Sequence, residues 1–203
     1  FSVRHSQCYL NSGCGLRVRG WDGFVLDNWF SGNEMAGYGS YDENASITLT
    51  GNRIEWNRQG GILVQGGSHY NITGNYIDRS GRSGLALLPR GDHPCSIMAI
   101  TGNVIYRSGK PEWGGESEYD STHVRFERVR GLVFTGNSLN IGRDDGGKGE
   151  WSPQYSIVVR GLGDAIIKDN VMHDGSLKEL IVDRGEHEAN VVIKDNLGTL
   201  KKI

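Results

Sequence analysis

The chain has 203 residues, the usual size of one domain, and its 31 glycines are about twice the average usage. Its 22 basic and 24 acidic residues give a formal net charge of −2, which lacks the basic excess of a protein that follows a phosphate backbone. No apolar run is long enough to span a bilayer, and a hydrophobic fraction of 36% is too high for a disordered chain. We therefore expect an ordered protein with neither a nucleic-acid partner nor a membrane span.

The first residues, Phe1–His5, show neither the charged start nor the apolar stretch of a signal peptide. A mature secreted protein or a piece of a longer chain would begin in the same way. Further along, Cys8, Cys14 and Cys95 have no metal-type spacing, so they leave the redox compartment open.

A tripeptide that ends in asparagine repeats along most of the chain. Four copies read Thr-Gly-Asn, and three degenerate copies end in Asp-Asn. The repeated asparagines are Asn28, Asn52, Asn75, Asn103, Asn137, Asn170 and Asn196. An apolar residue stands three positions before each of them, so the pattern keeps its register through seven copies. Internal repetition at this spacing is typical of a solenoid.

Within one copy the apolar period is two, as in Ser46–Thr50 and Gly61–Gln65. This period predicts three short strands per copy: one before the asparagine, one after it, and one about ten residues later. Such a unit cannot bury its apolar face alone, but stacked units can. We therefore expect an all-β parallel β-helix of about seven coils that forms one domain over residues 1–203, with the asparagines hydrogen-bonded in a ladder along one turn.

The repeated (T/K)(G/D)N-x-(I/L/M) units resemble those of the right-handed parallel β-helix proteins of the pectate-lyase-like superfamily, over roughly residues 5–198. The resemblance implies a single-stranded right-handed parallel β-helix, an extracellular or periplasmic location and a carbohydrate ligand. It leaves the chemistry open, because the superfamily includes hydrolases, lyases, tailspikes and adhesins. Because the chain begins inside a repeat, we also expect the N-terminal edge to be covered by missing sequence or by another chain.

The two longest spacings between asparagines, 34 and 33 residues, mark insertions in consecutive coils. These long loops, 107–122 and 142–154, both precede the third strand of their coil, and each contains a Gly-Lys-x-Glu-Trp motif. Insertions on one face of a solenoid usually form its binding face. The resemblance places the groove of the superfamily over the strand that follows this loop, so we expect the two loops to wall that groove.

Carboxylates in the loops and on the groove strand are the candidate catalytic residues. We expect Asp145 to be the acid, because its like-charged neighbour Asp144 would raise its pKa. Glu127 is the first choice for the opposing carboxylate, since a strand holds it rigidly. Asp144, Glu150 and Asp183 are further candidates. Asp144 and Asp145 would alternatively cap a turn or bind calcium, although no cofactor or metal site is otherwise indicated.

Aromatic and charged residues around the same groove are the candidate substrate-binding residues. Trp113 and Trp151 would stack on sugar rings or, alternatively, anchor their own loops. The remaining candidates are Glu112, His123, Arg125 and Arg160. His123 precedes the inward-facing Val124, so it is expected to face outward.

We expect a polysaccharide-processing protein, with glycoside hydrolysis as the first choice and two alternatives. A glycoside hydrolase needs two carboxyl groups across an open groove, which the loops supply in excess. A polysaccharide lyase acting on a uronic acid polymer would use an arginine to neutralise the substrate carboxylate. A non-catalytic glycan-binding or structural β-helix, such as a tailspike or adhesin, needs only a binding surface and no catalytic carboxyl pair. Carboxylates that are all paired with arginine would favour this third function; separated free carboxylates would favour hydrolysis.

Overall fold

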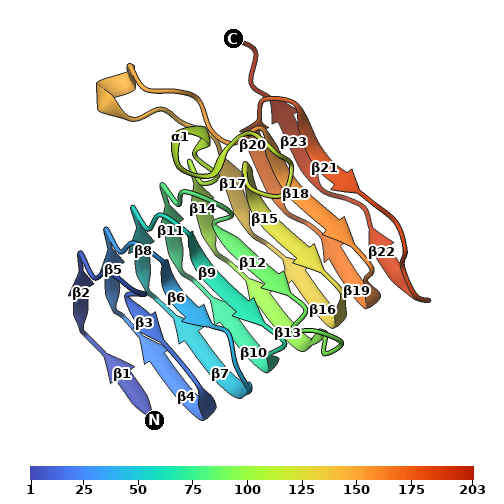
Figure 1. The fold of residues 1–203 in the computed structure, drawn as a ribbon. Helices are drawn as coiled ribbons and strands as arrows, with labels where there is room; N and C mark the ends of the chain where they lie inside the picture. The colour runs from blue at the N-terminus through green and yellow to red at the C-terminus, as the bar shows by residue number, and fades with distance from the viewer.

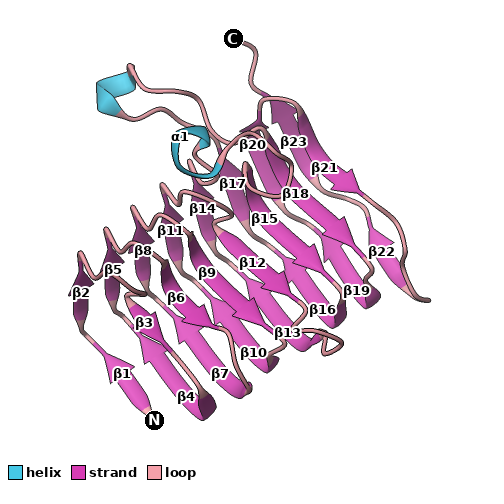
Figure 2. Cartoon of the chain, viewed as in Figure 1, coloured by secondary structure: helices cyan, strands magenta, loops and turns pink.

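The computed structural model describes residues 1–203, and its 23 strands wind into three parallel sheets (Figures 1 and 2). Sheet A contains β1 (Ser2–Arg4), β4 (Gly20–Leu26), β7 (Asn44–Thr50), β10 (Ser68–Thr73), β13 (Cys95–Thr101), β16 (Val129–Thr135), β19 (Gly163–Lys168) and β22 (Val191–Ile193). Sheet B contains β2 (Gln7–Tyr9), β5 (Trp29–Ser31), β8 (Arg53–Glu55), β11 (Tyr76–Asp78), β14 (Val104–Tyr106), β17 (Ser138–Asn140), β20 (Val171–Ser176) and β23 (Leu197–Leu200). Sheet C contains β3 (Leu16–Arg17), β6 (Ala36–Ser40), β9 (Gly60–Gln65), β12 (Leu85–Leu88), β15 (Thr122–Glu127), β18 (Tyr155–Arg160) and β21 (Glu179–Asp183).

Each coil takes one strand from sheet A, then one from sheet B, then one from sheet C. Every strand pairs in parallel with the equivalent strand of the next coil, which gives seven complete coils and two strands of an eighth. The expected parallel β-helix of about seven coils is therefore confirmed.

The corner between sheets A and B carries the asparagine ladder. The residue before each asparagine has a positive φ, which explains why it is glycine or aspartate: Gly51 has a φ of 69° and Asp27 a φ of 55°. Asn52 then donates from its backbone N and its Nδ2 to Asn75 Oδ1, at 3.0 and 2.9 Å. The same bonds link every ladder asparagine to the next, from Asn28 to Asn196. The predicted ladder is confirmed.

A second, shorter asparagine ladder lies at the corner between sheets B and C. Asn33 Nδ2 donates to Asn57 Oδ1 at 2.7 Å, and Asn11 Nδ2 donates to Asn33 Oδ1 at 2.8 Å. The sequence pattern Asn-x4-Asn, present at Asn28 and Asn33 and again at Asn52 and Asn57, would have predicted it. Buried serines, Ser80 and Ser108, take the same position in the next two coils.

Aliphatic side chains stack along the solenoid axis and form its core. In sheet B, Ile77 pairs with Ile54 on one side and with Ile105 on the other, and all three side chains are fully buried. Leu139 continues this column in the next coil. The inward alternation that the sequence predicted is therefore observed.

Both long insertions leave the solenoid between sheet B and sheet C, in adjacent coils, as predicted. The first carries the one-turn helix α1 (Pro111–Gly114), and the second carries the 3-10 turn η1 (Asp145–Gly147). Figure 1 shows both loops rising beside β14 and β17 at one end of the sheets. A third, smaller insertion, residues 89–94, separates β12 from β13. None of the helical segments has the length and apolar character required to cross a membrane.

Candidate functional site

The first long loop folds down over sheet C instead of standing beside it. Ser83 Oγ donates to the carbonyl oxygen of Tyr119 at 3.3 Å, and Glu118 pairs with Arg184 two coils away. The loop therefore spans the outer face of the sheet, where Val158 is only 1% exposed although it faces outward. At Val158 in coil six, the loop therefore covers the outer face where an open groove was expected.

An open hollow remains over the preceding coils, beside the loop. This hollow, called here the sheet C hollow, has a volume of about 250 Å³. Its lining comes from β9, β12, β15 and the loops that precede these strands: Gln59, Gly60, Leu63, Gln65, Arg82, Ser83, Ala86, Leu88, Tyr119, Asp120 and Arg125. Leu63, Gln65, Ala86 and Leu88 occupy the outward positions of their strands, where they alternate with the fully buried Ile62, Val64, Leu85 and Leu87.

Arg125 is the predicted substrate-binding residue that lines this hollow. Its guanidinium lies over the Tyr119 ring at 4.6 Å, and its Nη2 donates to Glu127 Oε2 at 2.6 Å. Its Nε is buried and has no hydrogen-bond partner. A buried donor without a partner is costly, and because this Nε is inaccessible, only the Nη groups of Arg125 can meet a ligand in the hollow.

His123 does not face outward, so the expectation that it binds substrate from the groove strand is wrong. Its side chain is fully buried, and neither ring nitrogen has a partner. Val124 pairs with Leu85, which places His123 opposite Gly84. A Cβ on Gly84 would lie 2.8 Å from Ile105 Cγ2, so this position points into the core. The chain bends at the corner before sheet C, and the strand alternation does not extend through the bend.

Burial lowers the pKa of His123 from 6.5 to about 3, because the imidazolium loses its hydration; the nearby backbone of Gly175 opposes this shift but does not form a well-aligned hydrogen bond with the ring. At neutral pH the ring is therefore uncharged, and it has no path to a ligand in the groove.

Asp144 is held by cations from three positions of the preceding coils. Its Oδ1 accepts from Arg79 Nε at 2.7 Å and from Arg107 Nη1 at 3.3 Å, while its Oδ2 accepts from Lys110 Nζ. Asp78, fully buried, pairs with Arg79 and Arg107 at 2.5 and 2.8 Å. These residues form a charge cluster that fixes the second loop to coils four and five. We call it the Asp144 cluster.

The pKa of Asp144 reflects two opposed effects. Burial raises it, but the hydrogen bonds from Lys110 and Arg79 outweigh burial and hold the pKa below its ordinary range. With both oxygens engaged, Asp144 is committed to holding the loop and offers no ligand for calcium. Its charge is also compensated, which removes the reason for expecting Asp145 to be a proton donor.

The remaining acidic loop candidates do not converge on the sheet C hollow. Asp145 is exposed in η1, and Glu112 pairs with Lys110 at 2.7 Å. Glu150 lines a separate hollow between the two loops, together with Trp151 and Lys148. The structure therefore brings none of these three carboxylates to the outer face of sheet C.

The two tryptophans lie on opposite sides of the inserted loops. Trp113 packs toward the N-terminal coils, 6.1 Å from the Trp56 ring. Trp151 lies toward the C-terminal coils, with Arg143 and Lys201 over its ring at 5.4 and 5.1 Å. Neither lines the sheet C hollow. These contacts favour the alternative in which each tryptophan anchors its own loop.

The groove-strand candidates Glu127, Arg160 and Asp183 do not form one continuous ladder of ion pairs. Glu127 pairs with Arg160 in the strand register, but Asp183 lies opposite Val159, one position away. Arg160 and Asp183 also form their ion pairs with residues outside this set. Arg160 binds Glu186 at 2.6 Å, and Asp183 contacts His187 at 2.8 Å.

The sequence reading missed the residues that build the Asp144 cluster. A signal was present, because Ile-x-Arg-Ser-Gly occurs at 77–81 and again at 105–109, in adjacent coils. Arginines at the same register of neighbouring coils lie close together, so the pattern predicts a cationic pair that requires an acid. No set of three or more His, Cys, Asp or Glu side chains is gathered as a metal site.

Comparison with known families places the chain among the β-helix proteins. A family model described as "Right handed beta helix region" matches residues 1–146. The chain belongs to the right-handed β-helix family. The match agrees with the three parallel sheets and the ladder, and it names no reaction.

Among solved structures, this β-helix protein is matched with HetL, a pentapeptide repeat protein involved in heterocyst differentiation regulation from the cyanobacterium Nostoc sp. strain PCC 7120. The identity is 10%, and the match covers 97% of this chain and 88% of the other. The TM-score is 0.19, so no functional inference is drawn from it.

Proposed function

We propose that the chain is a glycan-binding β-helix that holds a polysaccharide segment in the sheet C hollow without cleaving it. The observation that carries this proposal is the lining of the hollow. Leu63, Ala86 and Leu88 provide an apolar floor, and Tyr119 provides an aromatic ring at its side. Such surfaces suit the apolar faces of sugar rings.

Polar groups around the same floor would orient the hydroxyl groups of a sugar. Gln59 and Gln65 each offer an amide with donors and an acceptor, while Arg82 and Arg125 offer only donors. Their donors and acceptors face one small volume, which is the usual form of a site that selects a ligand by hydrogen bonding.

Binding without cleavage is supported by the state of the carboxylates. Hydrolysis needs one protonated and one ionised carboxyl group on either side of the bond. Asp120 is the one carboxylate that lines the hollow, where it lies 3.5 Å from Arg82 and accepts a hydrogen bond from Ser117. Glu127, next to the hollow, is paired with Arg125. Paired carboxylates favour the non-catalytic function that the sequence left open.

A second candidate, elimination on a uronic acid polymer, is favoured by Arg125 alone. The Arg125 guanidinium, which lines the hollow beside Tyr119, would neutralise a sugar carboxylate, as a lyase requires. The sheet C hollow contributes no histidine or lysine to remove the adjacent proton. We therefore rank elimination below binding.

One panel experiment separates these functions. Neutral and acidic polysaccharides are titrated calorimetrically, and each mixture is then assayed for new reducing ends and for unsaturated products, with and without chelator. Binding without products supports the proposal. Unsaturated products support the lyase, and new reducing ends without unsaturation support a hydrolase. The proposal is contradicted by any catalytic turnover, or by the absence of binding across the panel.

Variants locate the bound glycan. Tyr119→Ala should weaken binding about tenfold, because it removes the ring that would stack on a sugar. Tyr119→Phe should retain most of the affinity. Trp21→Ala is the matched control, since Trp21 is an exposed aromatic residue, 59% accessible, outside the hollow. Equal losses in Tyr119→Ala and Trp21→Ala would place the glycan elsewhere.

A further inference from the structure

The smallest insertion of the solenoid, residues 89–94, plays no part in the proposed glycan site. It lengthens the spacing between Asn75 and Asn103 to 28 residues, whereas Asn52 and Asn75 are 23 residues apart. Its sequence is Pro-Arg-Gly-Asp-His-Pro. In repeat proteins, an insertion confined to one coil commonly carries a binding function.

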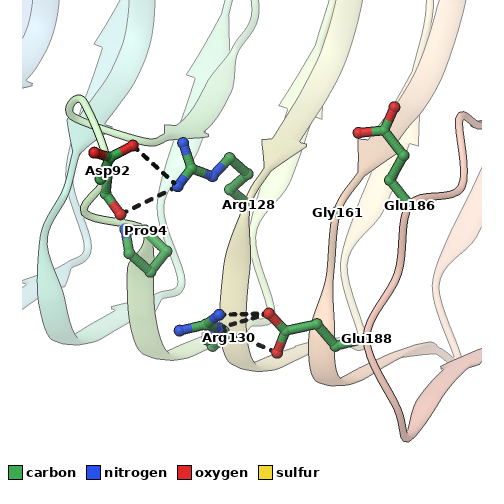
Figure 3. A pocket seen from close by; sticks show the side chains of 7 residues that line it. All are labelled: Asp92, Pro94, Arg128, Arg130, Gly161, Glu186 and Glu188. Atoms are coloured by element: carbon green, nitrogen blue, oxygen red, sulfur yellow. Dashed lines mark hydrogen bonds and ion pairs between the residues drawn. The ribbon is translucent and has the colours of Figure 1, made fainter.

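The insertion forms a tight hairpin with a fixed backbone. Arg90 N donates to His93 O at 2.9 Å, and His93 N donates to Arg90 O at 3.0 Å. Gly91, between them, has a φ of 56°, which glycine adopts without strain. The side chain of Arg128, from the next coil, donates to the carbonyl oxygen of Gly91 at 3.0 Å. It also donates to the carbonyl oxygen of Asp92 at 3.1 Å (Figure 3).

The charged groups at the hairpin tip are free for a partner. The Asp92 side chain is fully accessible, and its nearest cation, Arg128, lies 4.0 Å away. The Arg90 side chain is 46% accessible, and its nearest carboxylate, that of Asp42, lies 3.9 Å away. Exposed pairs at these distances contribute little, so both groups can exchange their present neighbours for a partner at low cost.

We propose that Arg90-Gly91-Asp92 is a docking element for a metal-dependent adhesion receptor. The Asp92 carboxylate would complete the coordination of a divalent cation held by the receptor, since hard cations prefer carboxylate oxygens. The Arg90 guanidinium would enter an acidic pocket of the same receptor. Because Gly91 has no side chain, the backbone of the hairpin could approach the backbone of the receptor closely.

Two features of the hairpin favour this partner. The prolines at positions 89 and 94 and the Arg128 hydrogen bonds fix the turn before binding, which reduces the entropy lost on docking. The two charged groups cancel, so the element lacks the net positive charge that attracts nucleic acid or an anionic membrane. The hairpin lies at the corner between sheets C and A and is separate from the sheet C hollow.

The test measures binding of the whole chain to the immobilised ectodomain of an adhesion receptor that binds Arg-Gly-Asp peptides, in magnesium buffer. Asp92→Glu keeps the charge but moves the carboxylate by one methylene group, and it should weaken binding by about a hundredfold. Chelation of the divalent cation should abolish binding, and a soluble Arg-Gly-Asp peptide should compete. Asp195→Glu is the control, because Asp195 is also an exposed aspartate with its nearest cation, Lys194, at 3.5 Å, and it lies outside the hairpin.

Three results would overturn the proposal: no saturable binding, equal affinity of the parent chain and Asp92→Glu, or binding that persists in chelator. Glycan titration of Asp92→Glu gives an independent readout. The variant should bind glycan like the parent, so failure of the receptor test and failure of the glycan proposal are distinguishable.

Discussion

At the scale of single residues, His123 has the clearest energetic consequence. Its pKa is lowered from 6.5 to about 3 by burial, so the unfolded chain takes up a proton before the folded chain does. The contribution of His123 to the free energy of unfolding is therefore constant above about pH 6.5. Between about pH 6.5 and about pH 3 it falls by about 1.4 kcal/mol per pH unit as the pH drops.

His123→Leu should remove this pH dependence. The leucine leaves no buried nitrogen unpaired, and replacing an unpartnered polar group by an apolar one is neutral or stabilising. Urea unfolding at about pH 7 and about pH 5 measures the effect, and the difference between the two free energies should be smaller in the variant than in the parent. An unchanged difference would show that the imidazole is hydrated in solution.

At the scale of elements, the aliphatic column of sheet B supports the stacking of the coils. Ile105→Ala should lower the free energy of unfolding by about 2–5 kcal/mol, because it opens a cavity between Ile77 and Leu139. Val104→Ala, its exposed neighbour, should change stability by about 0.5 kcal/mol or less. Similar melting temperatures for the two variants would mean that the column is not close-packed.

The second long loop depends on one carboxylate for its attachment. Asp144→Asn removes the charge that faces Arg79, Arg107 and Lys110, so the loop should detach from coils four and five. Limited trypsin digestion should then cut faster after Lys148, which is exposed in this loop. Asp145→Asn, an exposed neighbour outside the Asp144 cluster, should be cut at the parental rate.

The pH dependence of this attachment follows from the pKa of Asp144, which is held below its ordinary value. The stabilising charge is present at neutral pH and is lost only as the pH falls through the lowered pKa. Trypsin itself slows in acid, so cleavage after Lys148 is compared with cleavage of an unstructured peptide at the same pH; this ratio should not rise between about pH 8 and about pH 5. A higher ratio at about pH 6 would contradict this assignment.

The elements that the sequence predicted are those set by repetition. Ladder asparagines and inward aliphatic residues recur in every coil, so their positions follow from the period alone. Predictions failed where the chain departs from the repeat. The corner before His123 interrupts the alternation, and Gly37, Gly61 and Gly84 at the equivalent places were the available warning.

The loop conformations could not be predicted from spacing. Whether Asp144 faces the groove or the solenoid depends on Arg79, which lies 65 positions away in the chain. Trp113 similarly packs near Trp56, which belongs to an earlier coil. Each of these contacts joins residues that are far apart in the sequence, and each occurs only once. A repeating sequence pattern therefore cannot predict them.

At the scale of the whole molecule, each corner of the solenoid carries a different feature. Ladders hold two of the corners, the long loops leave the solenoid from the corner between sheets B and C, and the Arg-Gly-Asp hairpin leaves from the corner between sheets C and A. Because the coils stack rigidly, outward residues of β9, β12 and β15 keep fixed positions relative to one another. That rigidity suits recognition of an extended polymer, which would otherwise have to order a flexible site.

The most direct test of the central claim is a crystal structure of the chain with the oligosaccharide that binds most tightly in the panel. We predict that intact sugar rings lie in the sheet C hollow, with one ring against Tyr119 and a ligand oxygen within hydrogen-bonding distance of Arg125. Sugar bound at the second loop, on the outer faces of sheets A or B, or present only as cleaved product would contradict the account.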